Sequence, residues 1–174
     1  MKHLEIEMKT LLSEEEYDRL LAQFSKVTPV TQKNYYLDTP DFYLRHHKIA
    51  MRIRTFDTSA ELTIKIPQEV GNMEYNQSLT LEEAKYCLEN CKLPQGMILE
   101  ELTSRGLSTS GWVVLGCLTT VRYEKETAIG LMALDQSRYF DIVDYELELE
   151  VENGDQGSLD FQDFLQVNEI HYKK

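Results

Sequence analysis

The sequence predicts an α+β fold in which about eight antiparallel strands form the main sheet, enough to close a barrel. Segments in which apolar and polar residues alternate recur along the chain, as expected for strands. Most consecutive strands are separated only by turns, with helices inserted between some of them, which favours antiparallel pairing over βαβ units. With 174 residues and no linker or repeat, the chain is expected to form a single domain, residues 1–174.

The first strand is expected at residues 3–9, where apolar residues alternate strictly with Glu5, Glu7 and Lys9. This period of two places the three charged side chains on one face of the strand and the apolar ones on the other. Similar patterns predict the remaining strands at residues 30–38, 48–56, 60–67, 72–80, 112–126, 130–140 and 143–152.

Two capping boxes predict where helices begin. In Ser13-Glu-Glu-Glu16 the serine side chain can accept a hydrogen bond from the Glu16 N–H, and the Glu16 side chain can reach back to the Ser13 N–H. The segment from Thr80 to Glu83 repeats this pattern and opens a helix that ends near Cys91. Further helices are expected at residues 41–46, 96–105 and 158–166.

The composition excludes several classes of protein. A net charge of −12 argues against nonspecific binding of nucleic acid, which needs a basic face. No stretch approaches the roughly 20 apolar residues of a membrane helix, and the N-terminus lacks the apolar core of a signal peptide. The three cysteines show no zinc-ligand spacing and suit a reducing compartment. We therefore expect a cytoplasmic protein without a membrane or nucleic-acid partner, with a homodimer as the default oligomer.

The polar faces of several predicted strands carry like charges two residues apart. Such side chains lie about 7 Å apart and repel one another. The pairs are Glu5 with Glu7, Arg52 with Arg54, and Glu146 with Glu148, which Glu150 and Glu152 continue. A group of opposite sign lying between the strands would relieve this repulsion.

Two sets of charged residues therefore predict a binding site. Basic side chains that could surround a polyanion are Lys9, Arg52, Arg54, Lys65 and Arg122; carboxylates that could hold a hard divalent cation are Glu5, Glu7, Glu146 and Glu148. A metal-bound phosphate compound needs both sets. For any single strand, a solvated charged face with surface ion pairs is the better explanation, but the combination on separate strands favours a site.

The ordered set of motifs resembles the CYTH family of triphosphate tunnel metalloenzymes, and especially its small bacterial stand-alone members. The family's N-terminal Glu-x-Glu-x-Lys is matched by Glu5-Ile-Glu-Met-Lys9. Later motifs are matched, in order, by Arg52-Ile-Arg54, Lys65, Arg122, Leu134-Asp135 and Glu146-Leu-Glu148. Order and approximate spacing agree from residue 5 to about residue 150.

The resemblance implies an eight-stranded antiparallel barrel with a charged tunnel, helices packed outside, and Mg²⁺ or Mn²⁺ as cofactor. It implies metal binding by Glu5, Glu7 and Glu148, helped by Glu146, and phosphate binding and catalysis by Lys9, Arg52, Arg54, Lys65 and Arg122. It adds Asp135 to the metal candidates and Glu74 to the substrate-binding candidates. Glu150 shares the strand parity of Glu146 and Glu148, so the register of the acidic pair is open.

The function that the resemblance implies is metal-dependent hydrolysis, by direct attack of water, of inorganic triphosphate or of a small triphosphate-bearing molecule. Two alternatives stay open: a noncatalytic module that binds triphosphate or polyphosphate, and a class IV-type adenylate cyclase, for which the sequence shows no adenine pocket. The chain departs from the family pattern at its end, Asn168-Glu-Ile-His-Tyr-Lys-Lys174, where Glu169 stands in place of an expected Lys.

Overall fold

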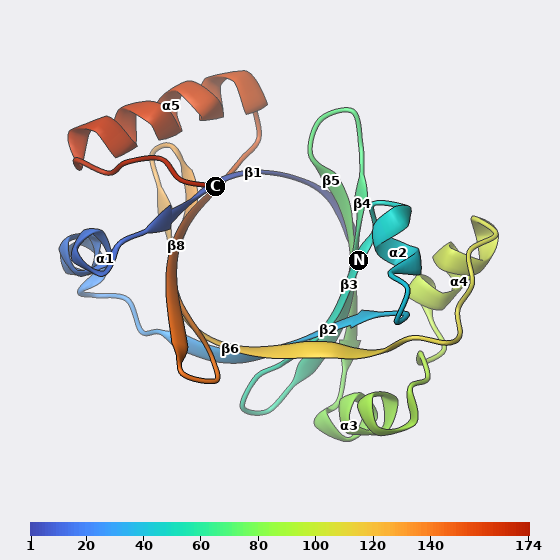
Figure 1. Ribbon diagram of the computed structural model, residues 1–174. Coiled ribbons are helices and arrows are strands. Elements are labelled where there is room, and N and C mark those ends of the chain that lie inside the picture. The colour runs from blue at the N-terminus through green and yellow to red at the C-terminus, as the bar shows by residue number, and fades with distance from the viewer. The chain divides into compact units, whose positions relative to one another are not determined.

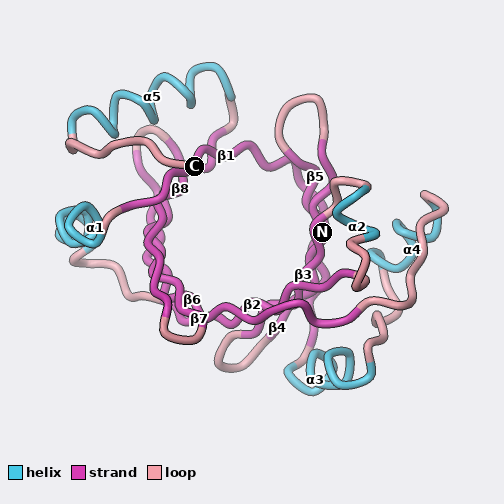
Figure 2. The backbone as a smooth tube through the Cα atoms, viewed as in Figure 1, coloured by secondary structure: helices cyan, strands magenta, loops and turns pink.

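The computed structural model describes residues 1–174, and its eight strands close into an antiparallel barrel in the order β1-β5-β4-β3-β2-β6-β7-β8 (Figures 1 and 2). The strands are β1 (Lys2–Leu12), β2 (Val30–Asp38), β3 (Ala50–Thr55), β4 (Ala60–Pro67), β5 (Asn72–Leu79), β6 (Val113–Thr127), β7 (Gly130–Tyr139) and β8 (Ile142–Val151). The helices are α1 (Glu14–Leu21), the 3-10 helix η1 (Ala22–Phe24), α2 (Tyr43–His46), α3 (Leu81–Asn90), α4 (Met97–Ser104) and α5 (Gly154–Val167). The predicted fold class is confirmed.

Both predicted capping boxes are formed. The Glu16 N–H donates to Ser13 Oγ at 3.1 Å, and the Ser13 N–H donates to Glu16 Oε1 at 2.8 Å. The Glu83 N–H donates to Thr80 Oγ1, and the Thr80 N–H donates to Glu83 Oε1, both at 3.0 Å. Each box satisfies two backbone donors that the first turn of a helix would otherwise leave unpaired.

The predicted start of the last helix, at residue 158, is wrong, because α5 begins at Gly154. Asn153 caps the helix by accepting a hydrogen bond from the Gln156 N–H at 3.0 Å. Glycine is a poor helix former, so Gly154 and Gly157 concealed the first turn in the sequence. A Cβ atom at Gly157 would lie 2.6 Å from a methyl carbon of Val151, so glycine allows the close approach of α5 to β8.

The elements form two compact units. The first comprises Met1–Leu4 and Gln32–Leu118, and the second comprises Glu5–Thr31 and Thr119–Lys174. Strands β3 to β5 with helices α2, α3 and α4 belong to the first unit, whereas α1, β7, β8 and α5 belong to the second. Strands β1, β2 and β6 contribute residues to both.

In the first unit, strand alternation gives the sheet one apolar and one polar face. The antiparallel register aligns Tyr35 with Ile53 and Ile53 with Leu62, which lie on the apolar face. Helices α2, α3 and α4 lie beside β3, β4 and β5 (Figure 1) and bury the apolar face. The core includes Leu37, Leu44, Met51, Ile53, Leu62, Ile64, Tyr75, Ala84, Ile98 and Leu102. Each large apolar side chain buried in this way stabilises the unit by roughly 1.5–3 kcal/mol.

The second unit is built in the same way from β1, β6, β7 and β8. Its apolar face is covered by α1, η1 and α5. The core contains Leu12, Tyr17, Leu20, Phe24, Met132, Leu134, Leu147, Leu149, Phe161 and Leu165. Since the helices occupy the apolar faces of the strands, the polar faces are the ones that line the inside of the closed barrel.

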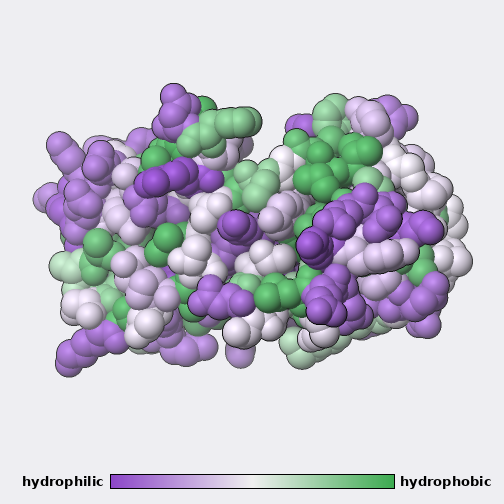
Figure 3. Space-filling model, turned by 90° about the horizontal axis from the view of Figure 1, so that it is seen from below, coloured by the Kyte–Doolittle hydropathy of each residue, from purple (hydrophilic) through white to green (hydrophobic).

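The outer surface is predominantly hydrophilic over the exposed side of α3, as the view from below shows (Figure 3). Exposed residues of this helix include Glu82, Glu83, Lys85 and Glu89. None of the helices combines the length and apolar character that crossing a membrane would require.

Candidate metal and phosphate site

The polar face of the second unit centres on Arg122 of β6. The register of β6 and β7 places Arg122 opposite Asp135, and the guanidinium donates from Nε to Oδ1 at 2.8 Å and from Nη2 to Oδ2 at 2.7 Å. The same Nη2 donates to Glu148 Oε2 at 3.2 Å. Burial alone lowers the pKa of Arg122, but these carboxylates raise it overall, so the side chain stays charged.

Three carboxylates gather beside this arginine. The register of β7 and β8 places Asp135 opposite Glu146, and Glu148 lies two residues further along the same strand face. Asp135, Glu146 and Glu148 each offer an oxygen within 4.8 Å of the others. Burial raises the pKa of Glu146 well above its ordinary value, and the adjacent Glu148 carboxylate raises it further. The cluster therefore holds more negative charge than Arg122 alone offsets.

The donor set suits a hard divalent cation. Carboxylate oxygens are the ligands that Mg²⁺ and Mn²⁺ prefer. An ion among these three would favour the charged form of Glu146, whose pKa is raised by burial and by the Glu148 carboxylate. Asp135, which is only 5% exposed, is fixed by its two hydrogen bonds to Arg122. A fixed carboxylate loses little freedom when it binds a metal ion.

Strand β1 brings the N-terminal motif to the polar face of the same unit. Its register with β8 places Lys9 opposite Glu148 and Glu7 opposite Glu150. The register also separates the glutamates of β8 from one another. Glu146 and Glu148 lie with Asp135, whereas Glu150 lies opposite Glu7. Glu7 is outside the cluster around Asp135, and Glu5, 8% exposed, is a buried residue of the same strand.

The polar face of the first unit carries the other basic side chains that the sequence analysis predicted to bind phosphate. Arg54 donates from Nε to Asn34 Oδ1 at 2.6 Å, and its Nη1 lies 3.8 Å from Glu61 Oε1. Lys65 Nζ lies 3.6 Å from Glu74 Oε2, across the β4–β5 ladder. Glu74, which the resemblance had placed among the substrate-binding candidates, thus lies beside a basic candidate and holds it in position.

Arg52 has a different environment from Arg54. It lies opposite Tyr36 on β2 and Thr63 on β4, and its Nε is buried without a hydrogen-bond acceptor. Buried donors almost always have a partner, so an unsatisfied one calls for an explanation. An anion bound on this face would supply the missing acceptor.

Sequence reasoning missed the neutral polar residues of this face. Thr63 Oγ1 donates to Asn76 Oδ1 at 2.6 Å, and Asn76 Nδ2 donates to Glu74 Oε1 at 2.8 Å. Asn34 and Thr63 are 2% and 1% exposed. For Thr63 the available signal was strand parity, since it lies between Leu62 and Ile64 on the same strand face as Lys65. Asn34 follows Lys33, so alternation gives no such signal there.

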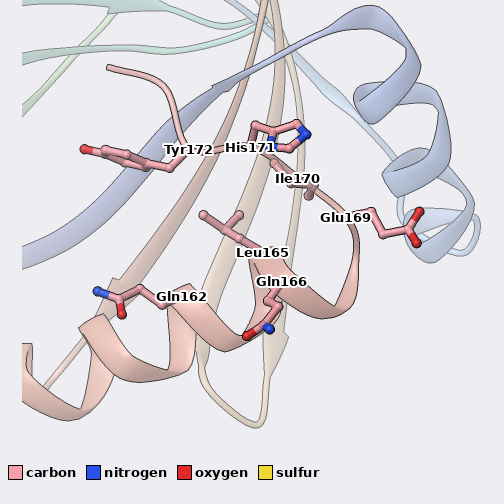
Figure 4. A pocket seen from close by; sticks show the side chains of 7 residues that line it. All are labelled: Gln162, Leu165, Gln166, Glu169, Ile170, His171 and Tyr172. Atoms are coloured by element: carbon pink, nitrogen blue, oxygen red, sulfur yellow. The ribbon is translucent and has the colours of Figure 1, made fainter.

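The C-terminal segment that departs from the family pattern is anchored to the second unit. The Lys173 N–H donates to Thr10 Oγ1 at 2.8 Å, and the Leu11 N–H donates to the Lys173 carbonyl at 3.1 Å. The His171 N–H and Lys173 Nζ each donate to a Glu16 carboxylate oxygen at 2.9 Å. Figure 4 shows this segment above α5, and the Glu169 side chain points away from the side occupied by Tyr172.

Comparison with known proteins agrees with the fold and the motifs. The CYTH domain model matches residues 3–174. The Bacillus subtilis (strain 168) protein named "Putative triphosphatase YjbK" is 34% identical over 167 residues, which are 95% of this chain and 86% of that protein.

Two solved structures are also similar. A Bacillus halodurans protein described as a "putative adenylate cyclase" is 34% identical, with a TM-score of 0.93, and the match covers 99% of this chain and 94% of that one. The Hippeastrum protein HpAC1, described as a "putative adenylyl cyclase" with a dominant triphosphatase activity, is 23% identical, with a TM-score of 0.82, and the match covers 98% of this chain and 90% of that one. At that identity HpAC1 supports the fold alone. With the family model matching nearly the whole chain and relatives at 34% identity, this protein belongs to the CYTH domain family.

Proposed function

We propose that this protein is a metal-dependent triphosphatase, which hydrolyses inorganic triphosphate or a small molecule that carries a triphosphate. The observation that carries the proposal is the cluster of Asp135, Glu146 and Glu148, in which Arg122 donates hydrogen bonds to Asp135 and Glu148. Membership of the CYTH family and the name of the Bacillus subtilis relative support the same reaction.

The proposed phosphate-binding residues of the second unit are Lys9 and Arg122. Those of the first unit are Arg52, Arg54 and Lys65. In phosphoryl transfer, positive groups held in place ahead of the reaction offset the charge that develops on the phosphate oxygens. The unsatisfied Nε of Arg52 and the carboxylate-fixed positions of Lys65 and Arg122 provide such groups.

The proposed metal ligands are Asp135, Glu146 and Glu148, with Glu5 and Glu7 as further ligands. When bound, Mg²⁺ or Mn²⁺ would neutralise phosphate oxygens and so favour attack by water on the terminal phosphorus. Arg122 keeps the Asp135 and Glu148 oxygens oriented, and Lys9, opposite Glu148, adds positive charge at the same edge. Asp135 and Arg122 therefore form a pair whose geometry is set before the substrate binds.

The proposal also covers the domain organisation, the cellular compartment and the partners of the protein. The protein would act as a single CYTH-like domain, residues 1–174, in the cytoplasm, on a small triphosphate and without a membrane or nucleic-acid partner. The net charge of −12 supports the last point, because phosphate-rich polymers bind basic surfaces. A homodimer remains the default oligomer for this proposal.

Adenylate cyclase activity is the second candidate, because the Bacillus halodurans relative carries that description. The two reactions differ in the group that attacks. A cyclase directs the ribose 3′-hydroxyl of ATP at the α-phosphorus and releases pyrophosphate, whereas a triphosphatase directs water at the terminal phosphorus and releases phosphate.

Product analysis distinguishes the candidates. The protein is incubated with inorganic triphosphate and, separately, with ATP in the presence of Mg²⁺ or Mn²⁺, and the products are identified by ³¹P NMR. Orthophosphate is expected. Cyclic AMP with pyrophosphate would establish the cyclase instead. Intact substrates, with triphosphate binding detected by calorimetry, would establish the noncatalytic module.

A further inference from the structure

Four polar side chains of the first unit are linked in series on the polar face of β4 and β5. The register of these strands places Thr63 opposite Asn76, and Lys65 opposite Glu74. Thr63 Oγ1 donates to Asn76 Oδ1 at 2.6 Å, and Asn76 Nδ2 donates to Glu74 Oε1 at 2.8 Å. The second carboxylate oxygen, Glu74 Oε2, lies 3.6 Å from Lys65 Nζ. The series therefore connects a buried hydroxyl group to a proposed phosphate-binding residue.

The orientation of the Asn76 amide is determined by its two partners. A carboxylate only accepts hydrogen bonds, so the amide must present Nδ2 to Glu74 and Oδ1 to Thr63. Thr63 is 1% exposed, so bulk water does not compete for its hydroxyl group. The backbone of Asn76 is held as well, because its N–H donates to the Met1 carbonyl at 2.8 Å. Thr63 thus fixes Asn76, and Asn76 fixes the Glu74 carboxylate.

The distance between Glu74 and Lys65 gives this arrangement a consequence for phosphate binding. A charge-assisted N–H···O hydrogen bond measures roughly 2.7–2.9 Å, and the 3.6 Å between Oε2 and Nζ is longer. With its other oxygen bonded to Asn76, the carboxylate attracts the ammonium group without forming a short hydrogen bond to it. If Asn76 released Glu74, the carboxylate could rotate onto Lys65 and compete with a phosphate oxygen for the ammonium group.

We propose that Asn76, oriented by Thr63, is a positioning residue of the phosphate site, which holds the Glu74 carboxylate where it orients Lys65 without competing for it. The inference rests on the proposed function and deepens it, because Asn76 acts on the bound phosphate only through Lys65. In metal sites, the hydrogen-bond partners that hold a ligand in place change affinity or activity by about 10–100-fold when they are removed. The lower end of that range is expected for Asn76.

The test is a double-mutant cycle that combines Asn76→Ala with Lys65→Ala. Binding of a methylene-bridged analogue of inorganic triphosphate, which resists hydrolysis, is measured by calorimetry in the presence of Mg²⁺. Asn76→Ala is expected to weaken binding about tenfold when Lys65 is present, and less than about twofold when Lys65 is already replaced. A residue with a purely structural role would give the same factor in both backgrounds.

Gln77→Ala is the matched control from the same strand. Gln77 points to the opposite face of β5 from Asn76, since the two are consecutive. Its amide also makes two hydrogen bonds, to the Gln95 carbonyl at 2.9 Å and from the Ile98 N–H at 3.5 Å. This variant therefore loses a similar number of bonds but should bind the analogue as the wild type does.

Thr63 provides a second pair of variants, which decides the question if Asn76→Ala does not fold. Thr63→Val keeps the shape of the side chain and removes the hydroxyl group, so binding of the analogue should weaken about threefold. Thr63→Ser keeps the hydroxyl group and should restore wild-type binding. Wild-type binding in Thr63→Val would overturn the inference.

The remaining outcomes separate this inference from the proposed function. Unchanged binding in Asn76→Ala, or equal factors in the two backgrounds, would overturn the inference and leave the function standing. If the wild type binds the analogue but releases no phosphate from inorganic triphosphate, the proposed hydrolysis fails, and a loss of binding that depends on Lys65 would still support the inference. A wild type that neither binds the analogue nor cleaves inorganic triphosphate would overturn both.

Discussion

Arg122 and Asp135 face each other across β6 and β7 and share two hydrogen bonds, of 2.8 and 2.7 Å. Such a fork-to-fork pair fixes both planar groups, whereas a single contact would leave each free to rotate. Because Asp135 is also part of the carboxylate cluster, the pair links the proposed phosphate-binding set to the proposed metal-binding set.

Removing the arginine should therefore damage both stability and activity. Arg122→Ala leaves the buried Asp135 carboxylate without this counter-charge, next to two glutamates, and is expected to lower the free energy of unfolding by about 3–5 kcal/mol. Urea denaturation measures this loss. Arg138→Ala, an exposed position on β7, is the control and should change stability by less than about 0.5 kcal/mol. Equal stability of Arg122→Ala and wild type would show that the pair is unimportant.

The carboxylate cluster predicts a specific defect in metal binding. Glu148→Gln removes one anionic ligand from the site, and is expected to weaken Mn²⁺ binding about tenfold or more, since affinity follows the charge of the ligand set. Calorimetric titration with Mn²⁺ measures the change. Glu152→Gln, an exposed glutamate just past the end of β8, should bind Mn²⁺ as the wild type does. Identical titrations for both variants would place the metal elsewhere.

Replacing Arg52 should weaken the binding of substrate without an equal loss of protein stability. Its Nε has no acceptor, so Arg52→Ala removes no hydrogen bond made by that atom in the free protein, and the melting temperature should change little. The KM for the triphosphate substrate should rise about 10–100-fold, as expected for the loss of a hydrogen bond to a charged group. Arg45→Ala on α2, which is exposed, serves as the control. An unchanged KM would remove Arg52 from the site.

Glu16 predicts how stability depends on pH. Burial alone raises the pKa of this carboxyl, but hydrogen bonds from Ser13, Lys173 and His171 outweigh burial and lower the pKa from 4.5 to about 2. A carboxylate with a depressed pKa in the folded state stabilises the fold above pH 4.5, and this contribution is lost as the pH falls toward 2.

Glu16→Gln is therefore expected to lower the free energy of unfolding at pH 7 by about 2–3 kcal/mol. The difference from wild type should shrink steadily as the pH is lowered from 5 to 2, because the wild-type carboxylate becomes protonated. Urea denaturation across this range measures it, and Glu15→Gln, an exposed neighbour, is the control. A difference that stays constant with pH would mean that the charge of Glu16 contributes nothing.

The sequence predicted the strands well, because each has one apolar and one polar face and alternation reports that directly. It predicted the start of α1 and α3 because a capping box is a local signal, whereas Gly154 and Gly157 concealed the start of α5. The grouping of Asp135 with Glu146 and Glu148 required the β7–β8 register, which depends on the β-turn and on contacts between distant residues.

A pocket of about 640 Å³ beside Tyr172 could not be predicted from sequence at all. Its walls come from β1, α5 and the C-terminal segment, which lie at opposite ends of the chain. The segment is held by Glu16, whose role as a helix cap was evident from sequence but whose bonds to His171 and Lys173 were not. A cap requires only neighbouring residues, whereas an anchor for a distant segment appears only in the folded chain.

Release of orthophosphate from inorganic triphosphate, measured with Mg²⁺, with Mn²⁺ and with a chelator in place of metal, tests the central claim most directly. We predict release with either metal ion, none with the chelator, and a loss of several orders of magnitude in Lys9→Ala, which should still fold as judged by circular dichroism. Release that persists in the chelator, or that is unchanged in folded Lys9→Ala, would contradict a metal-dependent triphosphatase built on these residues.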